Sequence, residues 1–249
     1  MAAPESIPTL SVPTQEQTGL IASGWHTAAV IFFLLGLAGL SAWKGAASPV
    51  GNVSANARMA NYATIFVWEW LTVAFIAWGV RRRGYRLANL IEGKWPTAGA
   101  FARDLGISVL FLMGSGVVLG SIRWALHDKP NDAVRNLLPD RPVEMAMWVA
   151  LAATAGFCEE TIFRGYLQKQ FSRLTRDAGA GLALQAFVFG ACHGYQGVKS
   201  MFTITVYGLL FGLLANHVKN LRPGMLAHFL QDGIAGLAGR ALLKRLPSG

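Results

Sequence analysis

Three short motifs in the second half of the chain place acidic and histidine side chains within otherwise apolar sequence. They are EETIFR at 159–164, FGACH at 189–193 and HFLQD at 228–232. An ionisable side chain in the middle of a membrane helix costs on the order of 2.5–3.5 kcal/mol on insertion scales, so such residues are functional candidates by default. The chemistry of this protein is therefore predicted to reside in these motifs.

The first motif separates two neighbouring carboxylates. On an α-helix Glu160 and Arg164 are i,i+4 neighbours and can pair, whereas Glu159 points about 100° away and has no partner in its own helix. An unpaired carboxylate in a low-dielectric setting is suited to act as a general base at neutral pH. For this motif alone, two acids that anchor the helix at the membrane interface are an equally good interpretation.

The three motifs are predicted to meet at one depth. If the polar stretch between Arg176 and Gly179 is a turn between two helices, Glu159 and His193 lie equally far from it and roughly 13 Å deep. His228 lies about 11 Å deep by the same measure. Lone histidines on apolar faces are more often core residues, but two histidines and a free glutamate at one level favour a site.

The composition places these motifs in a membrane. The chain has 249 residues, 53% hydrophobic and 14% charged, with a mean hydropathy of +0.39. Soluble domains average roughly 25% charged residues, and so much apolar material excludes a disordered chain. The sequence predicts an all-α, polytopic transmembrane bundle of about seven spans. The expected spans are 20–43, 62–80, 105–122, 143–168, 181–194, 201–217 and 225–243.

The polar residues 1–19 contain no Lys or Arg and are predicted to be a disordered tail rather than a secretory signal. Residues 20–249 are predicted to form one membrane domain with its catalytic core at about 143–243. The net charge of +9 is interpreted as orientation signals and head-group contacts, not nucleic-acid binding. The cluster RRRGYR at 81–86 favours an inside N-terminus, whereas the absence of Lys and Arg from the tail argues the other way.

Two pairs of glycines, Gly116 with Gly120 and Gly208 with Gly212, have the GxxxG spacing of close helix contacts. Simple enrichment of glycine in membrane helices explains them nearly as well. His26 and His217 lie near span ends, where ordinary interfacial positions are expected.

A carboxylate and an imidazole can hold and deprotonate a water molecule, and a second histidine with a polar neighbour can stabilise an oxyanion. This is the equipment for peptide hydrolysis without a covalent intermediate. Glu159, His193 and His228 could also hold a zinc ion that carries the water. A thiol nucleophile from Cys158 or Cys192 is conceivable, but packing of small residues is the better interpretation.

The ordered set of three motifs resembles the CPBP family of intramembrane proteases, also called the CAAX protease and bacteriocin-processing or Abi family, which includes the type II CAAX prenyl endopeptidase. The flanks FCEETIFRGYL and LRPGMLAHFLQD are similar to those of the family, and the resemblance covers about residues 145–235.

The resemblance implies that Glu159 activates water with His193, and that His228 and Asp232 stabilise the oxyanion. Phe189, Glu160 and Arg164 would support them. Family members often have Asn at the position of Asp232, and an ionised Asp cannot donate a hydrogen bond. Asp232 must therefore be protonated or act by orienting His228.

We expect an intramembrane endopeptidase of the glutamate type, without a cofactor, in the cytoplasmic membrane of a prokaryote. Its substrate would be a peptide or lipid-modified protein tail, processed in CAAX fashion or at a leader peptide. The alternatives are a non-catalytic immunity or scaffold protein of the same fold, or a proton-coupled transporter that uses Glu69, Glu159 and the histidines. Glu69 would line the substrate cavity or, in the favoured interpretation, pair with an arginine.

Overall fold

The computed structural model of the chain describes residues 19–47, 53–128 and 132–243, and within them every regular element is a helix. The predicted all-α fold is confirmed. The predicted tail lies outside the described residues except for residue 19. The long helices are α2 (Gly24–Ala47), α3 (Ala55–Arg81), α5 (Ala98–Leu126), α7 (Pro142–Glu159), α9 (Ala178–Cys192), α10 (Val198–Val218) and α11 (Arg222–Leu243).

Each long helix contains or overlaps one expected span, in the expected order. Most run further than expected because polar residues outside the apolar runs cap them. The Ser54 hydroxyl accepts a hydrogen bond from Ala57 N at the start of α3, and the Thr97 hydroxyl does the same for Ala100 N in α5. Hydropathy alone does not reveal these extra turns.

Shorter elements connect the long ones. They are α4 (Leu87–Ile91), α6 (Asp132–Leu137), the π-helix η1 (Glu160–Gln168), α8 (Lys169–Thr175) and the 3-10 helix η2 (Gly194–Gln196). Because α7, η1 and α8 follow without a break, Pro142–Thr175 forms one helical rod of 34 residues. The sequence predicts a plain α-helix over 143–168, and this is wrong from Glu160 onward, where the helix widens into a π-helix.

Five of the described helices are long and apolar enough to cross a membrane: Gly24–Trp43, Ala55–Arg81, Ala98–Leu126, Pro142–Thr175 and Val198–Val218. Large apolar side chains project from them, and Phe32 and Trp124 are each 82% exposed. Lipid is the solvent that suits such a surface. The 15 residues of α9 span only about 22 Å, less than a bilayer core.

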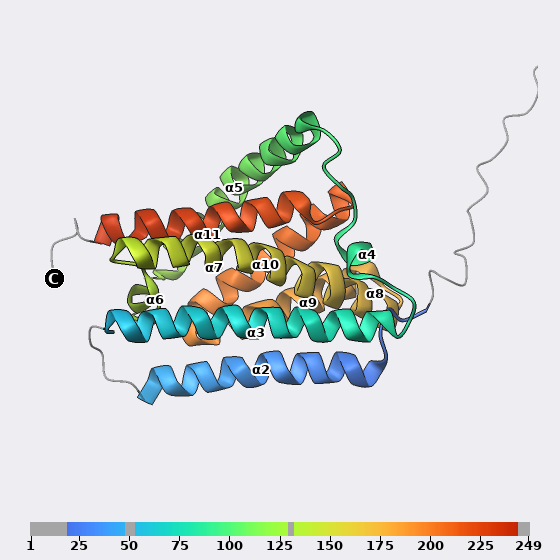
Figure 1. Cartoon of the computed structure of the whole chain (residues 1–249), viewed down its shortest axis with the longest axis horizontal. Coiled ribbons are helices and arrows are strands. Elements are labelled where there is room, and N and C mark those ends of the chain that lie inside the picture. The colour runs from blue at the N-terminus through green and yellow to red at the C-terminus, as the bar shows by residue number, and fades with distance from the viewer. Residues whose placement is uncertain (1–18, 48–52, 129–131, 244–249) are drawn as a thin grey trace, which may run out of the picture.

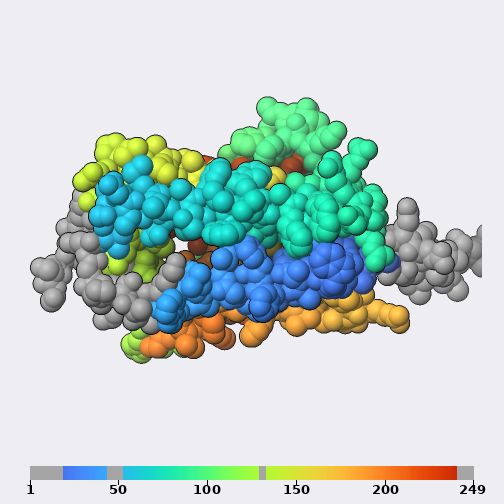
Figure 2. Space-filling model, turned by 60° about the horizontal axis from the view of Figure 1, so that its bottom comes forward, coloured from blue at the N-terminus to red at the C-terminus, as the bar shows by residue number. Residues whose placement is uncertain are grey.

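The helices surround η1. Figure 1 shows α2, α3, α7 and α11 running side by side, with α9 and α10 behind them and α5 inclined away from the rest. All nine residues of η1 are buried, and α3, α4, α9 and α10 pack against it. On the face formed by α2 and α3, the surface is hollowed between the two helices (Figure 2). The motif with the most charge thus lies in the most enclosed helix.

The expectation of close contact at the GxxxG pairs is confirmed for α10 and wrong for α5. A Cβ atom at Gly208 would lie 3.1 Å from Cα of Ala186, and one at Gly212 would lie 2.6 Å from Oε1 of Gln168. Nothing lies within 4 Å of such an atom at Gly116 or Gly120. The physical reason is that α5 is inclined away from the other helices (Figure 1), and both glycines are on its exposed side.

His26 lies beside Trp78 near the N-terminal end of α2, with ring centres 6.0 Å apart, but it is a buried core residue and not an ordinary exposed one. It is only 1% exposed; its Nδ1 lies 2.8 Å from the Tyr166 hydroxyl and its Nε2 lies 3.0 Å from the Phe75 carbonyl oxygen. The ring fits because Gly79 has no side chain: a Cβ there would lie 2.5 Å from ring carbons of His26. His26 thereby joins α2 and α3 to η1, whereas His217 is exposed as expected.

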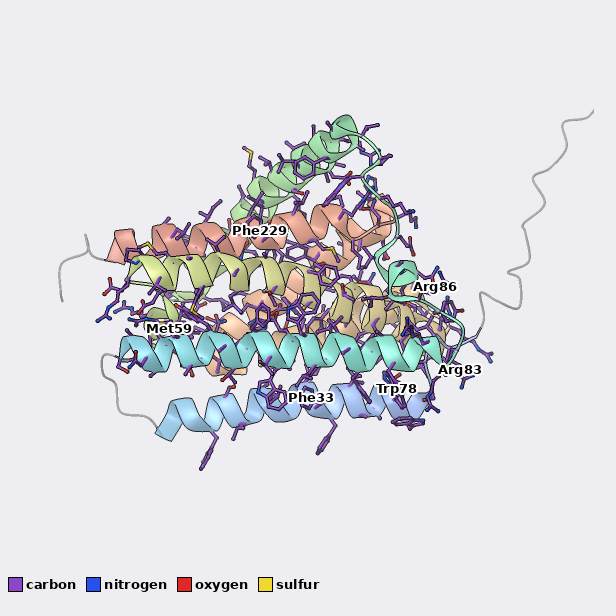
Figure 3. All side chains as sticks on the ribbon, viewed as in Figure 1. Phe33, Met59, Trp78, Arg83, Arg86 and Phe229 are labelled. Atoms are coloured by element: carbon purple, nitrogen blue, oxygen red, sulfur yellow. The ribbon has the colours of Figure 1, made fainter. Side chains whose placement is uncertain are left out.

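The two ends of the bundle differ in their side chains. Figure 3 shows Trp78, Arg83 and Arg86 at the end where α3 terminates, Met59 toward the opposite end, and Phe33 between α2 and α3. Arg82 lies over the Trp78 ring at 4.5 Å, and α8 ends at the same end of the bundle. Tryptophan and arginine are typical of a membrane–water interface.

Candidate active site

A close crossing of α7 and α11 brings the first and third motifs together. A Cβ atom at Gly156 would lie 2.7 Å from the Met225 carbonyl oxygen and 3.0 Å from Phe229 N. Only glycine permits this approach. Glu159 and Glu160 follow Gly156 within about one turn of the helix, and His228 lies between the two contacted residues of α11.

The predicted pair between Glu160 and Arg164 is present and fully buried. Arg164 Nη1 donates to Glu160 Oε1 at 2.9 Å, and the two side chains are 1% and 0% exposed. The Arg164 guanidinium also lies 4.4 Å from the Phe189 ring centre and 4.9 Å from that of Phe211. Because a buried charge is stable only when paired, this arginine and glutamate hold each other in place.

His228 occupies the centre of the site, among three carboxylates. Its Nδ1 donates to Glu160 Oε1 at 3.1 Å. Its Nε2 lies 3.6 Å from Glu159 Oε2 and 3.6 Å from Asp232 Oδ2. Glu160 therefore receives hydrogen bonds from both Arg164 and His228, whereas Glu159 has no hydrogen-bond partner for its buried Oε2 among the described residues.

Exposure separates the two glutamates further. The Glu159 side chain is 19% exposed and that of Asp232 is 33% exposed, against 1% for Glu160. Glu159 and Asp232 thus face accessible space, and Glu160 is shut inside the protein. This is the division between a free and a neutralised carboxylate that the EExxxR spacing predicts.

His193 comes near the cluster but not as part of a helix. The sequence predicts a helix over 181–194, yet α9 ends at Cys192, and His193 caps it before the 3-10 turn η2. Its Nδ1 lies 2.8 Å from the Phe189 carbonyl oxygen. A carbonyl can only accept, so Nδ1 carries the proton and Nε2 presents a lone pair. Among the described residues His193 makes no direct contact with Glu159, but its ring interacts electrostatically with the Asp232 carboxylate.

Phe189 holds the two histidines apart and in position. Its ring centre lies 4.9 Å from that of His193 and 6.3 Å from that of His228, and the Arg164 guanidinium covers its ring. Asp232 is fixed through its backbone, because Trp148 Nε1 donates to the Asp232 carbonyl oxygen at 2.8 Å. The structure thus brings Glu159, Glu160, Arg164, His228 and Asp232 into contact range and places His193 and Phe189 beside them.

Glu69 faces this cluster, and the favoured expectation that it pairs with an arginine is wrong for the described residues. It interacts electrostatically with Glu159, His228 and Asp232, and its buried Oε2 has no hydrogen-bond partner in the described ranges. A glutamate between Trp68 and Trp70 in an apolar helix indicates a functional or structural role, but the sequence of α3 does not show which neighbouring helix the glutamate faces.

The sequence analysis missed further residues beside the site. The Tyr207 hydroxyl donates to Gln231 Oε1, and Tyr195 stacks on His193 with ring centres 6.2 Å apart. Burial raises the pKa of the Tyr195 phenol to about 12, so the phenol keeps its proton at neutral pH. Polar residues in apolar segments are the signal that could have found Tyr207 and Gln231; nothing in the sequence marks Tyr195.

The structure also places the two cysteines and the residues that the sequence analysis names as zinc ligands. Cys158 is fully buried, and both cysteines are free thiols. Within the described residues, no three His, Cys, Asp or Glu side chains are grouped so as to hold a metal ion. Both ring nitrogens of His228 face carboxylates, which leaves that ring poorly placed to donate a lone pair to a metal.

Fold and site together define a polytopic membrane protein with carboxylates and imidazoles gathered around a buried arginine. Residues 141–234 match the family described as Type II CAAX prenyl endopeptidase Rce1-like. This stretch contains all three motifs, and it confirms the resemblance to the CPBP or CAAX protease family. The family indicates a protease, and the helices indicate an integral membrane protein. No curated protein and no solved structure matches the chain.

Proposed function

We propose that the protein is an intramembrane endopeptidase that uses a glutamate-activated water molecule. The observation that carries the proposal is the pairing pattern of the two glutamates. Glu160 is occupied by Arg164 and His228, while Glu159 keeps its buried Oε2 without a hydrogen-bond partner beside His228, on a side chain that is 19% exposed. A carboxylate in that condition can accept a proton from water.

In the proposed reaction Glu159 and Nε2 of His193 hold the water between them. Glu159 takes one proton as the water oxygen bonds to the carbonyl carbon of the scissile peptide, and the carbonyl oxygen becomes an oxyanion. The carbon–nitrogen bond then breaks, and Glu159 returns the proton to the leaving amine nitrogen. One residue therefore serves as base and then as acid, and no covalent enzyme intermediate forms.

His228 is the proposed oxyanion donor, with Glu160 and Asp232 positioning it. Its Nδ1 is anchored on Glu160, so its Nε2 is held facing the space between Glu159 and Asp232. Asp232 lies 3.6 Å from that nitrogen, and this supports the role of orienting His228 over that of donating to the oxyanion itself.

The proposed substrate is a lipid-modified, CAAX-type protein tail, because the matched family is that of a prenyl endopeptidase. A helical bundle that exposes apolar side chains to lipid, with its polar cluster enclosed, suits a substrate that carries its own membrane anchor. The hollow between α2 and α3 (Figure 2) is the proposed side of approach, because Glu69 lies on α3 and interacts electrostatically with the cluster. Leader-peptide processing is the alternative substrate class.

The test is hydrolysis of an internally quenched peptide that carries a farnesylated CAAX sequence, by protein purified in detergent. Glu159→Gln keeps the size of the side chain and removes the base, so we expect kcat to fall about 10²–10⁴-fold. Asp177→Asn is the matched control: it makes the same change from carboxylate to amide at the exposed N-cap of α9, where asparagine caps as well as aspartate and we expect little change.

Glu159→Gln protein that cleaves as fast as the wild type would refute the proposal. If neither the wild type nor any variant cleaves prenylated or leader peptides, while Glu159→Gln leaves the cellular phenotype intact, the protein is the non-catalytic scaffold instead.

A further inference from the structure

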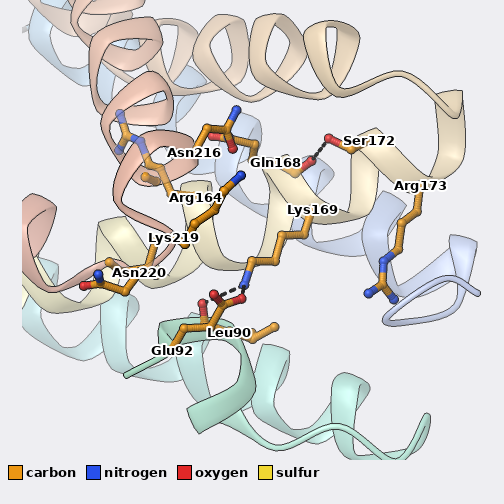
Figure 4. A pocket seen from close by; sticks show the side chains of 12 residues that line it. Leu90, Glu92, Arg164, Gln168, Lys169, Ser172, Arg173, Asn216, Lys219 and Asn220 are labelled. Atoms are coloured by element: carbon orange, nitrogen blue, oxygen red, sulfur yellow. Dashed lines mark hydrogen bonds and ion pairs between the residues drawn. The ribbon is translucent and has the colours of Figure 1, made fainter. Parts of the chain in front are cut away.

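A cavity with basic side chains in its lining lies at the end of the bundle where α3 terminates, separate from the partly exposed faces of Glu159 and Asp232. It measures about 240 Å³ and is bounded by η1, α8, the end of α10 and the segment after α4. Figure 4 shows the side chains of Arg164, Lys169 and Lys219 gathered around it. The aromatic packing of Arg164 against Phe189 and Phe211 divides this cavity from the rings of the active site.

The lining of this cavity is strongly basic. Four cationic side chains and one carboxylate contribute to it, namely Arg164, Lys169, Arg173, Lys219 and Glu92. Lys169 Nζ already pairs with Glu92 at 2.5 Å, and Arg173 donates to the Gly19 carbonyl and the Tyr85 hydroxyl. The one carboxylate among the lining residues, Glu92, is therefore already paired with Lys169, and the other cationic side chains leave the cavity with an excess of positive charge.

Two cationic donors in the cavity remain unused among the described residues. Nε of Arg164 is buried without a hydrogen-bond partner, and the Lys219 ammonium makes no hydrogen bond or ion pair in the part of the chain that the structure describes. A buried donor without a partner costs about 1–3 kcal/mol. An anion in the cavity would bind the exposed Lys219 ammonium directly and would add negative charge beside the buried Arg164 guanidinium.

We propose that this cavity binds the phosphate group of an anionic phospholipid. Its walls are helix ends at the level of Trp78 and the arginines that follow α3, where lipid head groups lie (Figure 3). Phosphate oxygens accept from the exposed Lys219 ammonium at the rim, with Lys169 and Arg173 adding positive charge to the lining, while the acyl chains extend along the exposed helices.

The site would connect lipid binding to the active site through one residue. Arg164 lines the cavity and at the same time donates to Glu160, which anchors His228. A bound phosphate therefore places negative charge beside the guanidinium that sets the position of the proposed oxyanion donor. The binding itself is independent of the proposed proteolysis and is tested without a substrate.

The experiment adds dioleoylphosphatidylglycerol or dioleoylphosphatidylcholine to the delipidated full-length protein in detergent. Native mass spectrometry measures bound lipid, and the rise in Tm with lipid concentration gives the affinity. Two variants change the cavity at exposed positions: Lys219→Glu, and Asn216→Asp, which adds a negative charge and still accepts from Gln168 Nε2. Arg81→Glu is the matched control, an exposed cation at the same end that does not line the cavity.

We expect phosphatidylglycerol to bind the wild type, and phosphatidylcholine to bind at least about tenfold more weakly. One basic residue near an anionic lipid is worth roughly a fivefold change in affinity. Asn216→Asp should thus weaken phosphatidylglycerol binding about fivefold, Lys219→Glu about 25-fold, and Arg81→Glu less than about twofold. The unliganded Tm and the gel-filtration profile show whether each variant is folded.

Free glycerol 3-phosphate distinguishes the two sources of a phosphate group. Displacement of the lipid only at far higher concentrations than phosphatidylglycerol itself identifies a membrane lipid as the ligand. Displacement of phosphatidylglycerol by an equal concentration of free glycerol 3-phosphate overturns the proposal that a membrane lipid supplies the phosphate. Equal binding of both lipids, or unchanged phosphatidylglycerol binding by both cavity variants in folded form, overturns the site.

Discussion

The substitution Gly156→Ala tests whether the crossing of α7 and α11 assembles the site. The new Cβ would lie 2.7 Å from the Met225 carbonyl oxygen, and ordinary contact begins at 3.4 Å, so the two backbones must separate by about 0.7 Å. His228 is three residues beyond Met225. Its hydrogen bond to Glu160 would lengthen from 3.1 Å to about 3.8 Å, which is beyond hydrogen-bond range.

We expect this change to reduce kcat far more than it reduces stability. Overpacking costs about 1–3 kcal/mol, and replacing glycine within a helix returns about 0.5–1 kcal/mol, so the protein should remain folded. A displacement of about 1 Å in a catalytic group can cost on the order of 10²-fold in rate. Loss of the farnesylated-peptide cleavage by ~30–100-fold, with a Tm within a few degrees of the wild type, is therefore the expected result.

The control is Gly116→Ala, the same substitution in a membrane helix where nothing lies within 4 Å. It should leave kcat unchanged and raise Tm slightly, because helix propensity improves without a clash. Wild-type kcat in folded Gly156→Ala protein would refute the reasoning, since the site would then tolerate separation of the helices that build it.

Two further predictions concern the buried histidine of α2 and the metal question. His26→Ala should destabilise the protein by about 2–4 kcal/mol, because it removes two hydrogen bonds and leaves a cavity between α2, α3 and η1. Denaturant unfolding in detergent measures this; His217→Ala, at an exposed histidine, should change stability by less than about 0.5 kcal/mol, and equal effects of the two variants would contradict the role of His26. Cleavage of the farnesylated peptide should persist in excess 1,10-phenanthroline, since His228 directs both ring nitrogens at carboxylates. Loss of activity that zinc restores would reverse this prediction and assign the glutamate and histidines to a metal.

The parts of the site that the sequence predicts are those set by local geometry. The pair of Glu160 with Arg164 follows from the i,i+4 spacing of residues on one helix, and it is present at 2.9 Å although the helix there is π rather than α. The depth argument needs only the rise per residue and the positions of the turns, and it places Glu159 and His228 at similar depths; their side chains lie 3.6 Å apart. The same argument places His193 level with Glu159, but the two make no direct contact among the described residues. Such features depend on a few neighbouring residues.

The parts that it does not predict depend on contacts between distant helices. Glu69 and His26 are both polar residues in apolar helices, and the sequence assigns the first to an arginine and the second to the interface. The structure turns Glu69 to the catalytic cluster and buries His26 against Phe75 and Tyr166, because Gly79 leaves room for its ring. A period of 3.6 residues tells which face of a helix is apolar, but it does not tell which neighbour a polar side chain meets.

The π-helix explains how one short motif serves two separate sites. Its first residue, Glu160, accepts from His228, and Arg164 donates to that same carboxylate and also lines the basic cavity. The last residue, Gln168, binds the Gly212 carbonyl and Asn216 on α10. Because all nine residues of η1 are buried among other helices, tertiary contacts compensate for its unusual hydrogen-bond pattern. The geometry of this segment therefore depends on the helices packed around it.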